Sequence, residues 1–208
     1  MPPRAPTKPR KRAAQERSRA TVDALVEATA RILVGEGFDK ASTNRIAAVA
    51  GVSIGSLYQY FPGKEALVMA VAQRHRHELV RMVRGALAEV AAEPLARGVA
   101  ALVAAAVEAH RVDPALHRVL AEEIPRLGEL EDAARIDQGN HSLFREWLEG
   151  HRSELRVPDM ELAVFVCATT VEALTHHAVL HHADVLAGAR MEALVDETTR
   201  LILGYLTG

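Results

Sequence analysis

Residues 43–67 read TNRIAAVAGVSIGSLYQYFPGKEAL, and this stretch decides the fold. The pattern of apolar residues at its start predicts a short helix ending at about Ala50, and Gly51 suits the left-handed backbone position that follows a helix end. Ser53 is a natural N-cap for a second short helix. Ala47 is small enough for two helices to cross closely, so the stretch predicts a helix-turn-helix.

The second short helix has two chemically different faces. Leu57 and Phe61 are four residues apart and share the face predicted to be buried. The opposite face and its sides carry small or hydrogen-bonding side chains, which suit either a DNA major groove or an ordinary solvated hairpin. These side chains are Gly55, Ser56, Tyr58 and Gln59. Tyr60 lies between the buried and the exposed face, and geometry alone leaves Ile54 free to pack inward or to point outward.

Charge is unevenly distributed along the chain. Residues 1–62 carry ten Lys/Arg and five Asp/Glu, a net charge of +5, so the remainder must sum to −7 within the total of −2. Seven of the ten cations lie in the first 19 residues. A basic end on an acidic body indicates an anionic partner held at that end, which moves the interpretation of the hairpin towards DNA.

The composition, rich in Ala, Val and Leu, predicts an all-α fold of about nine helices. We expect residues 1–16 to form a disordered basic arm, residues 17–63 a helix-turn-helix domain that begins with a helix at about Arg17, and residues 64–208 a helical body. Gly35 or Gly37 is expected to cap the first helix. The long helices are predicted at 64–91, 95–112, 115–123, 129–153, 159–183 and 190–206, with breaks at Pro94, Asp113-Pro114, Pro125, Val157-Pro158 and Gly188.

Several classes of protein are disfavoured. The longest charge-free apolar runs, 99–107 and 162–171, are shorter than the ~20 residues that span a bilayer, and no apolar segment follows the basic N-terminus as in a secretory signal. The single cysteine, Cys167, excludes an internal disulfide framework and fits the reducing cytoplasm. A Gly-rich phosphate loop, a nucleophile elbow and paired catalytic carboxylates are lacking, so we expect neither an enzyme nor a cofactor.

Residues 43–67 resemble the DNA-binding signature of the TetR family of bacterial transcriptional regulators, through I-A-x-x-A-G-V-S, L-Y-x-Y-F and K-E-x-L. The resemblance extends back to about residue 17. It implies a homodimeric repressor that binds a palindromic operator in double-stranded DNA and is released by a small-molecule inducer. The alternatives are an activator or a metal-sensing regulator on the same scaffold, or a metalloenzyme that uses the histidines near residue 180.

The resemblance also implies residue roles. Thr43 caps the second helix of the domain and meets a phosphate, while Asn44 and Arg45 reach towards the duplex. The positions implied to read base edges are Ile54, Gly55, Ser56 and Tyr58, and those implied to hold the phosphate backbone are Ser53, Tyr60 and Lys64. The cations of the basic arm, Lys8, Arg10, Lys11 and Arg12, are expected to add salt-dependent, sequence-independent affinity.

The body is implied to dimerise and to enclose an inducer. Residues 160–180 are apolar nearly all round, so this helix must be covered on more than one side. The last helix carries a stripe that could complete a four-helix interface with a second copy: Leu194, Val195, Thr198, Leu201, Ile202 and Tyr205. A monomeric bundle is the alternative.

Polar and aromatic side chains in these apolar helices are candidate ligand contacts. Glu172 and His176 lie one turn apart, and they either bind ligand with the other candidates, pair with each other or mark the dimer contact. The other candidates are His110, His117, His141, Phe144 and Trp147, of which the aromatics are equally explained as core.

The segment THHAVLHHAD, residues 175–184, is a weak candidate metal site. His177, His181 and Asp184 share one helix face at spacings of four and three residues, but the zinc motif H-E-x-x-H is absent. These side chains could equally face solvent or a dimer partner, and we expect no metal. Cys167, inside an apolar helix, is expected to be buried and unreactive.

Overall fold

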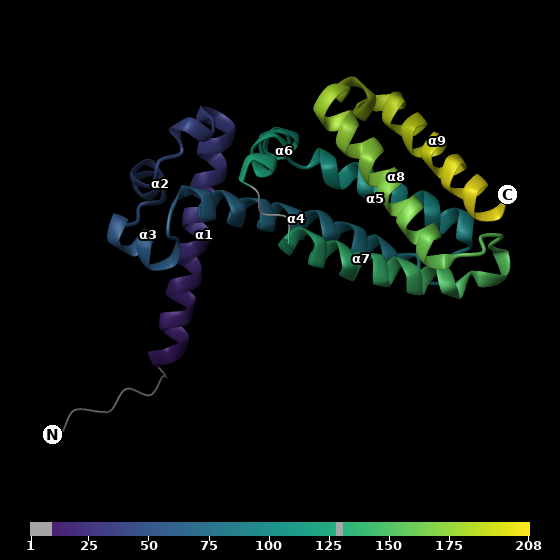
Figure 1. The fold of residues 1–208 in the computed structure, drawn as a ribbon, viewed down its shortest axis with the longest axis horizontal. Coiled ribbons are helices and arrows are strands. Elements are labelled where there is room, and N and C mark those ends of the chain that lie inside the picture. The colour runs from purple at the N-terminus through teal and green to yellow at the C-terminus, as the bar shows by residue number, and fades with distance from the viewer. Residues whose placement is uncertain (1–9, 128–130) are drawn as a thin grey trace. The chain divides into compact units, whose positions relative to one another are not determined.

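The computed structural model describes residues 10–127 and 131–208, with side chains placed over 16–124 and 141–208. Across these described residues the chain forms α-helices and no strand, which confirms the predicted fold class (Figure 1). The chain divides into two compact units, Met1–Ala72 and Gln73–Gly208, and the division falls inside α4 (Lys64–Glu89). The predicted boundary, between residues 63 and 64, lies at the start of that helix.

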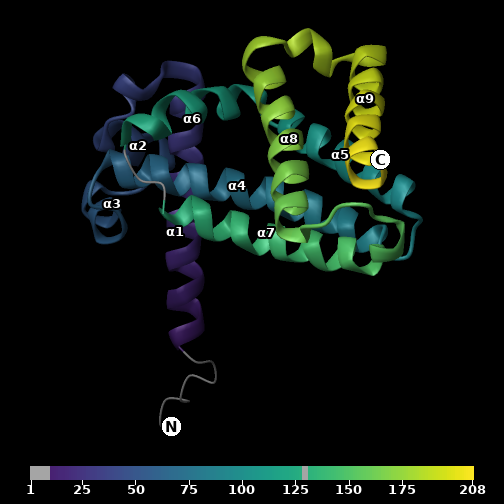
Figure 2. The same cartoon turned by 45° about the vertical axis from the view of Figure 1, so that its right-hand side comes forward.

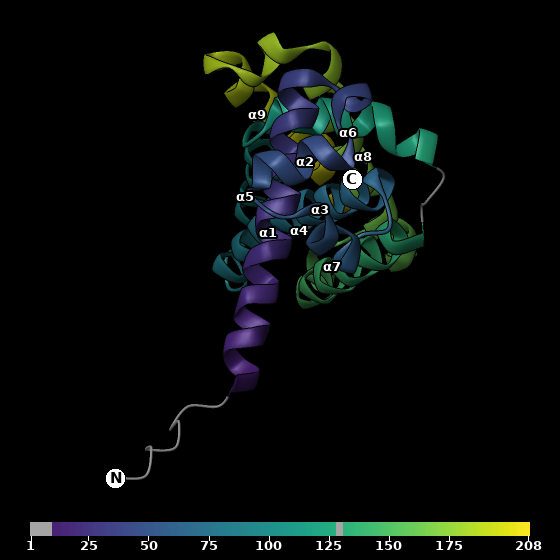
Figure 3. The same cartoon turned by 90° about the vertical axis from the view of Figure 1, so that its left-hand side faces the viewer.

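The N-terminal unit contains α1 (Arg10–Glu36), α2 (Thr43–Ala50), α3 (Ile54–Tyr60) and the start of α4. A 3-10 turn, Phe38–Lys40, joins α1 to α2; α2 packs against α1, and α3 against α2 (Figure 3). Its core consists of large apolar side chains with almost no exposed surface, contributed by all four helices. They include Leu25, Leu33, Ile46, Leu57, Leu67, Val68 and Val71.

Helix α1 begins at Arg10, so the prediction of a disordered arm up to residue 16 is wrong for its last residues. The sequence Arg-Lys-Arg-Ala-Ala-Gln-Glu that follows Pro9 consists entirely of strong helix formers, and this propensity outweighs the mutual repulsion of the cations. Residues 1–9 lie outside the described part. At the C-terminal end of α1, Gly37 is the capping glycine, one of the two that were predicted. It has φ 84°, and its N–H donates to the carbonyl oxygens of Ile32 and Leu33.

The body contains the remaining helices, whose bounds lie close to the predicted ones. They are α5 (Leu95–Arg111), α6 (Pro114–Leu127), α7 (Glu131–Gly150), α8 (Met160–His181) and α9 (Gly188–Thr207), with 3-10 turns at Arg152–Glu154 and Ala183–Leu186. Helix α8 packs against α5, α6, α7 and α9, and α5 also packs against α9 (Figure 2). The predicted break at Pro125 is wrong. Helix α6 continues to Leu127, so the proline stands in its last turn.

The core of the body is centred on Trp147, the only tryptophan of the chain. Its indole Nε1–H donates to the carbonyl oxygen of Val90 at 3.3 Å, and its ring lies directly over Gly98 of α5. A Cβ atom at Gly98 would overlap the indole ring, so this glycine is what allows α5 and α7 to approach. Cys167 is buried in the same core, as predicted, and burial raises the pKa of its thiol to about 11.

Helix α8 is long and apolar enough to cross a bilayer by length and composition alone. The prediction from charge-free runs missed this because Glu161 and Glu172 interrupt the helix without making it polar overall. Part of its surface packs into the core of the body, through Ala163, Val164 and Cys167 among others, while Leu162 and Phe165 are exposed. Partial burial of this kind is also found in the central helices of soluble bundles.

Candidate functional site

The two helices of the predicted hairpin are held together by local hydrogen bonds. Gly51 adopts φ 67° and ψ 27°, and its N–H bonds back to carbonyl oxygens of α2. The next N–H, that of Val52, donates to the carbonyl oxygen of Ala47 at 3.0 Å. The hydroxyl of Ser53 accepts the N–H of Ser56 at 3.1 Å and caps α3, as predicted. These contacts establish the helix-turn-helix.

Helix α3 presents one face to its own unit and the other to solvent. Leu57 is completely buried, whereas Tyr58 is 55% exposed and Ile54 is 39% exposed. Ile54 therefore does not pack inward, and the alternative that the sequence left open is decided. Phe61 is the C-cap residue of α3, with an extended backbone at φ −132°, and is half-buried.

The polar side chains of this face are bonded to one another. The hydroxyls of Thr43 and Tyr58 lie 3.2 Å apart and link α2 to α3, while those of Ser53 and Ser56 lie 2.8 Å apart. The hydroxyl of Tyr60 donates to Ser18 of α1 at 3.2 Å. Tyr58 and Tyr60 are thus held in place without being buried. Asn44 and Gly55 are exposed on the same unit, and the space beside Gly55 is open.

The helix cap implied at Thr43 is wrong. Ser42 is the N-cap of α2, with φ −74° and ψ 149°, and its hydroxyl accepts the N–H of Arg45. Thr43 is already the first helical residue. The sequence Ser-Thr offers two capping residues in succession, and the choice depends on which one has the extended backbone that a cap requires.

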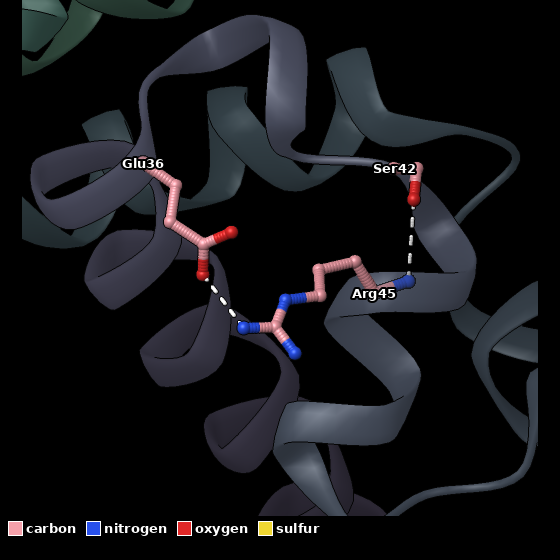
Figure 4. Close-up of polar contacts among 3 residues, drawn as sticks. All are labelled: Glu36, Ser42 and Arg45. Carbon is pink, nitrogen blue, oxygen red and sulfur yellow. Dashed lines mark hydrogen bonds and ion pairs between the residues drawn. The ribbon is translucent and has the colours of Figure 1, made fainter.

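Arg45 forms an ion pair with Glu36, which lies outside the predicted DNA-binding residues. Its guanidinium donates to a carboxylate oxygen of Glu36, the last residue of α1, at 2.8 Å (Figure 4). This hydrogen bond from Arg45, aided by its charge, lowers the pKa of Glu36. The two residues are nine positions apart and on different helices, so no spacing rule would have joined them.

Lys64, predicted to hold the DNA backbone, contacts the turn between α1 and α2. Its ammonium group lies 3.9 Å from the centre of the Phe38 ring and donates to the Phe38 carbonyl oxygen at 3.4 Å. The side chain is half-buried and its position is fixed. The side chains of Lys8, Arg10, Lys11 and Arg12 lie outside the described ones.

In the body, three of the predicted ligand residues come together with a fourth histidine, forming what we call the histidine cluster: His75, His110, His117 and His176. The ring nitrogens of His117 lie 3.2 Å from Nε2 of His75 and 2.8 Å from Nδ1 of His176. The ring of His110 contacts that of His117 edge-on at 5.0 Å, and its Nδ1–H donates to the carbonyl oxygen of Ala106. The cluster therefore joins α4, α5, α6 and α8.

Burial favours the uncharged form of three members of the cluster, His75, His110 and His117. Desolvation is the largest cause that lowers the pKa values of His75 and His110, and it lowers that of His117 to about 3, with help from the neighbouring histidines. In a neutral imidazole one nitrogen donates and the other accepts. His117 consequently donates one of its two hydrogen bonds and accepts the other. It either accepts from His75 and donates to His176, or does the reverse.

The other predicted ligand residues do not join the cluster. Phe144 and Trp147 stack at 6.0 Å between ring centres, and Trp147 instead borders an open groove of about 570 Å³ between the end of α4 and α7. Glu172 is exposed, and His176 bonds to His117 and not to Glu172, although the charge of Glu172 does act on His110. His141 lies on α7, half-buried. His75 was missed because it lies in the polar run Arg74–His77, which is typical of a solvent-exposed helix face.

The residues considered for a metal site lie at the surface. His177, His181 and His182 form a group of exposed rings, while Asp184 belongs to the following 3-10 turn and pairs with Arg190. Among the described residues, no group of three or more His, Cys, Asp or Glu side chains is arranged to hold a metal ion.

Comparisons with known proteins agree with this architecture. The family described as "Bacterial regulatory proteins, tetR family" matches residues 25–71, and "Tetracyclin repressor-like, C-terminal domain" matches residues 94–206, more than half of the chain. Among solved structures, a TetR-family protein from Mesorhizobium loti MAFF303099 has a TM-score of 0.73 at 17% identity, covering 92% of this chain and 99% of that one. The fatty acid degradation regulator FadR from Bacillus halodurans has a TM-score of 0.66 at 21% identity, covering 88% and 95%.

Two curated relatives match over shorter stretches. The HTH-type transcriptional activator FasR of Mycolicibacterium smegmatis is 44% identical over 63 residues, which are 30% of this chain and 29% of that protein. The nucleoid occlusion factor SlmA of Haemophilus ducreyi is 27% identical over 110 residues, 53% of this chain and 52% of that protein. The chain thus spans about half or less of these relatives, while the family match extends over both of its units. With its helix-turn-helix and the match to the family's C-terminal domain, the chain belongs to the TetR family of bacterial transcriptional regulators.

Proposed function

We propose that this regulator is a homodimeric repressor in the cytoplasm, which binds a palindromic operator and is released by a small-molecule inducer. The proposal that it binds DNA rests on the two faces of α3: Leu57 is fully buried, while Ile54 and Tyr58 face outward. A short helix anchored by one side chain leaves its whole outer face available to a major groove.

The outer face of the N-terminal unit divides into two kinds of contact. Residues of α3 read base edges: Ile54 meets a thymine methyl group, Gly55 lets the backbone approach, and Ser56 and Tyr58 supply hydroxyls. Residues around them hold phosphates and set the register. They are Thr43, Asn44, Arg45, Ser53, Tyr60 and Lys64.

A second copy of the chain covers the apolar surface that the body leaves exposed. Phe165 is 57% exposed and Leu201 is 55% exposed, and Leu162, Leu174 and Tyr205 are also at the surface of α8 and α9. The predicted stripe of α9 divides here, because Thr198 and Ile202 face the core of their own body while Leu201 and Tyr205 point away from it. Two α8–α9 pairs would form a four-helix interface.

The histidine cluster is the proposed centre of inducer recognition. Its members come from four helices, and α4, which carries His75, also carries Lys64 at its first residue. A ligand that prefers one arrangement of these helices changes DNA affinity by the factor by which DNA changes the ligand's affinity. An activator is the second candidate, because the relative FasR, 44% identical over 63 residues, is named an activator.

Footprinting on the DNA that flanks the protein's own gene tests this function. We expect protection of a symmetric site with two half-sites, lost progressively as salt increases. Protection of an asymmetric site or of no site at low salt would refute the proposal. Transcription from the protected promoter, measured with and without the protein, separates a repressor from an activator.

Two substitutions separate base reading from backbone binding. Tyr58→Ala is expected to abolish specific protection without loss of helicity, because the side chain is exposed. Lys64→Ala is expected to weaken binding to all sequences and to reduce the slope of log affinity against log salt by about one. Circular dichroism of both variants provides the control. Specific protection that survives in Tyr58→Ala would contradict the base-reading role.

A further inference from the structure

Arg45 carries its charge where its own helix disfavours one. It is the third residue of α2 after the Ser42 cap, and the first turn of α2 contains no acidic residue. The N-terminal end of a helix bears partial positive charge, so a guanidinium there is stabilised by an anion from outside the helix. Glu36 supplies that anion (Figure 4).

The charge of Glu36 is likewise disfavoured by its own helix, in this case at the C-terminal end. It is the last residue of α1, where the helix bears partial negative charge, and the last turn of α1 contains no basic residue. The ion pair therefore relieves two unfavourable charges at once. Both side chains remain exposed, at 51% for Arg45 and 39% for Glu36, so a stronger anion can compete for the guanidinium.

We propose that Glu36 is a positioning residue that keeps Arg45 from DNA phosphates and thereby lowers the sequence-independent part of DNA affinity. In the free protein the Glu36 carboxylate is hydrogen-bonded to the Arg45 guanidinium. A DNA phosphate must displace this carboxylate before it can bind Arg45. This inference rests on the proposed role of Arg45 at DNA. Non-specific binding depends almost entirely on phosphate contacts, so this competition limits how much protein is retained by non-operator DNA.

The first measurement is the affinity of the full-length protein for a 20-base-pair duplex of arbitrary sequence, at several salt concentrations. Glu36→Gln is expected to increase affinity by about threefold or more at low salt. It is also expected to steepen the salt dependence by about one, because the freed Arg45 displaces one more counterion. Glu36→Ala, which leaves no hydrogen-bonding group, should behave in the same way.

A double-mutant cycle shows whether the effect passes through Arg45. Removing any negative charge near DNA increases affinity somewhat, so the increase must be compared in the presence and absence of the arginine. We expect the gain from Glu36→Gln to be at least threefold larger with Arg45 than in an Arg45→Gln protein. Asp39→Asn is the matched control, since it removes one exposed carboxylate three residues away and should give the same gain in both backgrounds.

Each other outcome overturns the proposal. Equal gains from Glu36→Gln in both backgrounds would mean that Glu36 acts only as bulk charge. A loss of affinity would mean that Glu36 presents Arg45 to the phosphates. If the unaltered protein does not bind the duplex even at the lowest salt, the proposed DNA interface itself fails, and this inference fails with it. Thermal unfolding of every variant, expected to remain cooperative with only a small change in midpoint, shows that the differences are not caused by misfolding.

Discussion

At the scale of single residues, the contact between Gly98 and Trp147 sets the distance between two helices of the body. The indole ring occupies the space that a side chain on residue 98 would need, and its N–H is bonded to the carbonyl oxygen of Val90. The ring cannot move away without losing that bond and opening the core around Leu148. Gly98 is thus required for packing and not for a turn.

Gly98→Ala is therefore expected to lower the free energy of unfolding by about 1–3 kcal/mol, the usual effect of overpacking a core. Because Trp147 is the only tryptophan, its fluorescence emission should shift as the ring is displaced. Gly85→Ala is the control: this glycine is in α4 with open space around it, so alanine should stabilise by about 0.5–1 kcal/mol. Equal stability of the Gly98→Ala and unaltered proteins would show that the interior can adjust.

At the scale of elements, the histidine cluster joins four helices, and three of its imidazoles are buried (His75, His110 and His117). Burial disfavours the charged form of an imidazole, and it is the main cause of the lowered pKa values of His75, His110 and His117. Each histidine that is neutral in the folded protein becomes protonated in the unfolded chain once the pH falls below about 6.5. The unfolded state then binds more protons than the folded state, and acid favours unfolding.

These three histidines are accordingly expected to leave the free energy of unfolding unchanged above about pH 6.5 and to lower it as the pH decreases towards the pKa of His117, about 3. Each histidine contributes a slope of at most ~1.4 kcal/mol per pH unit. Chemical denaturation measured at intervals between pH 7 and pH 4 gives this slope.

His117→Gln should reduce the acid sensitivity, because glutamine does not titrate. His77→Gln, which alters an exposed histidine of the same α4, should leave the slope unchanged. A slope that is identical in His117→Gln and the unaltered protein would show that His117 is not responsible.

At the scale of the whole molecule, the proposed homodimer is tested at the apolar surface of α8 and α9, which a second copy of the chain would cover. The exposed side chains there include Phe165 and Leu201, each more than half exposed. Phe165→Glu is expected to dissociate the dimer or to weaken it by at least tenfold, since a buried unpaired carboxylate is costly at an interface. Sedimentation velocity over a range of concentrations measures this directly.

Val112→Glu provides the matched control, because Val112 is equally exposed but lies beyond the end of α5. It should leave the sedimentation profile unchanged. If the unaltered protein remains monomeric at all concentrations, the proposed homodimer is contradicted. Specific binding to a two-fold symmetric operator would then need another explanation.

Much of this architecture was predictable because its signals are local. Gly51, Ser53 and Leu57 each act on residues within one or two helical turns, so the hairpin, its turn and its buried anchor follow from spacing and residue type. The long helices are similarly delimited by proline and glycine. The predictions were wrong at Arg10, Ser42 and Pro125, each of which lies at the end of a helix, where neighbouring residues can serve equally well as the terminus.

The sequence by itself therefore determined the helix-turn-helix, the all-α class and the face of α3 that carries Tyr58. Only the tertiary structure decided which distant residues meet. Glu36 was joined to Arg45, His75 to His117, and Trp147 to Gly98, across separations that no helical period relates. The physical reason is that such contacts depend on how helices pack against one another, and packing is set by the shapes of many side chains together.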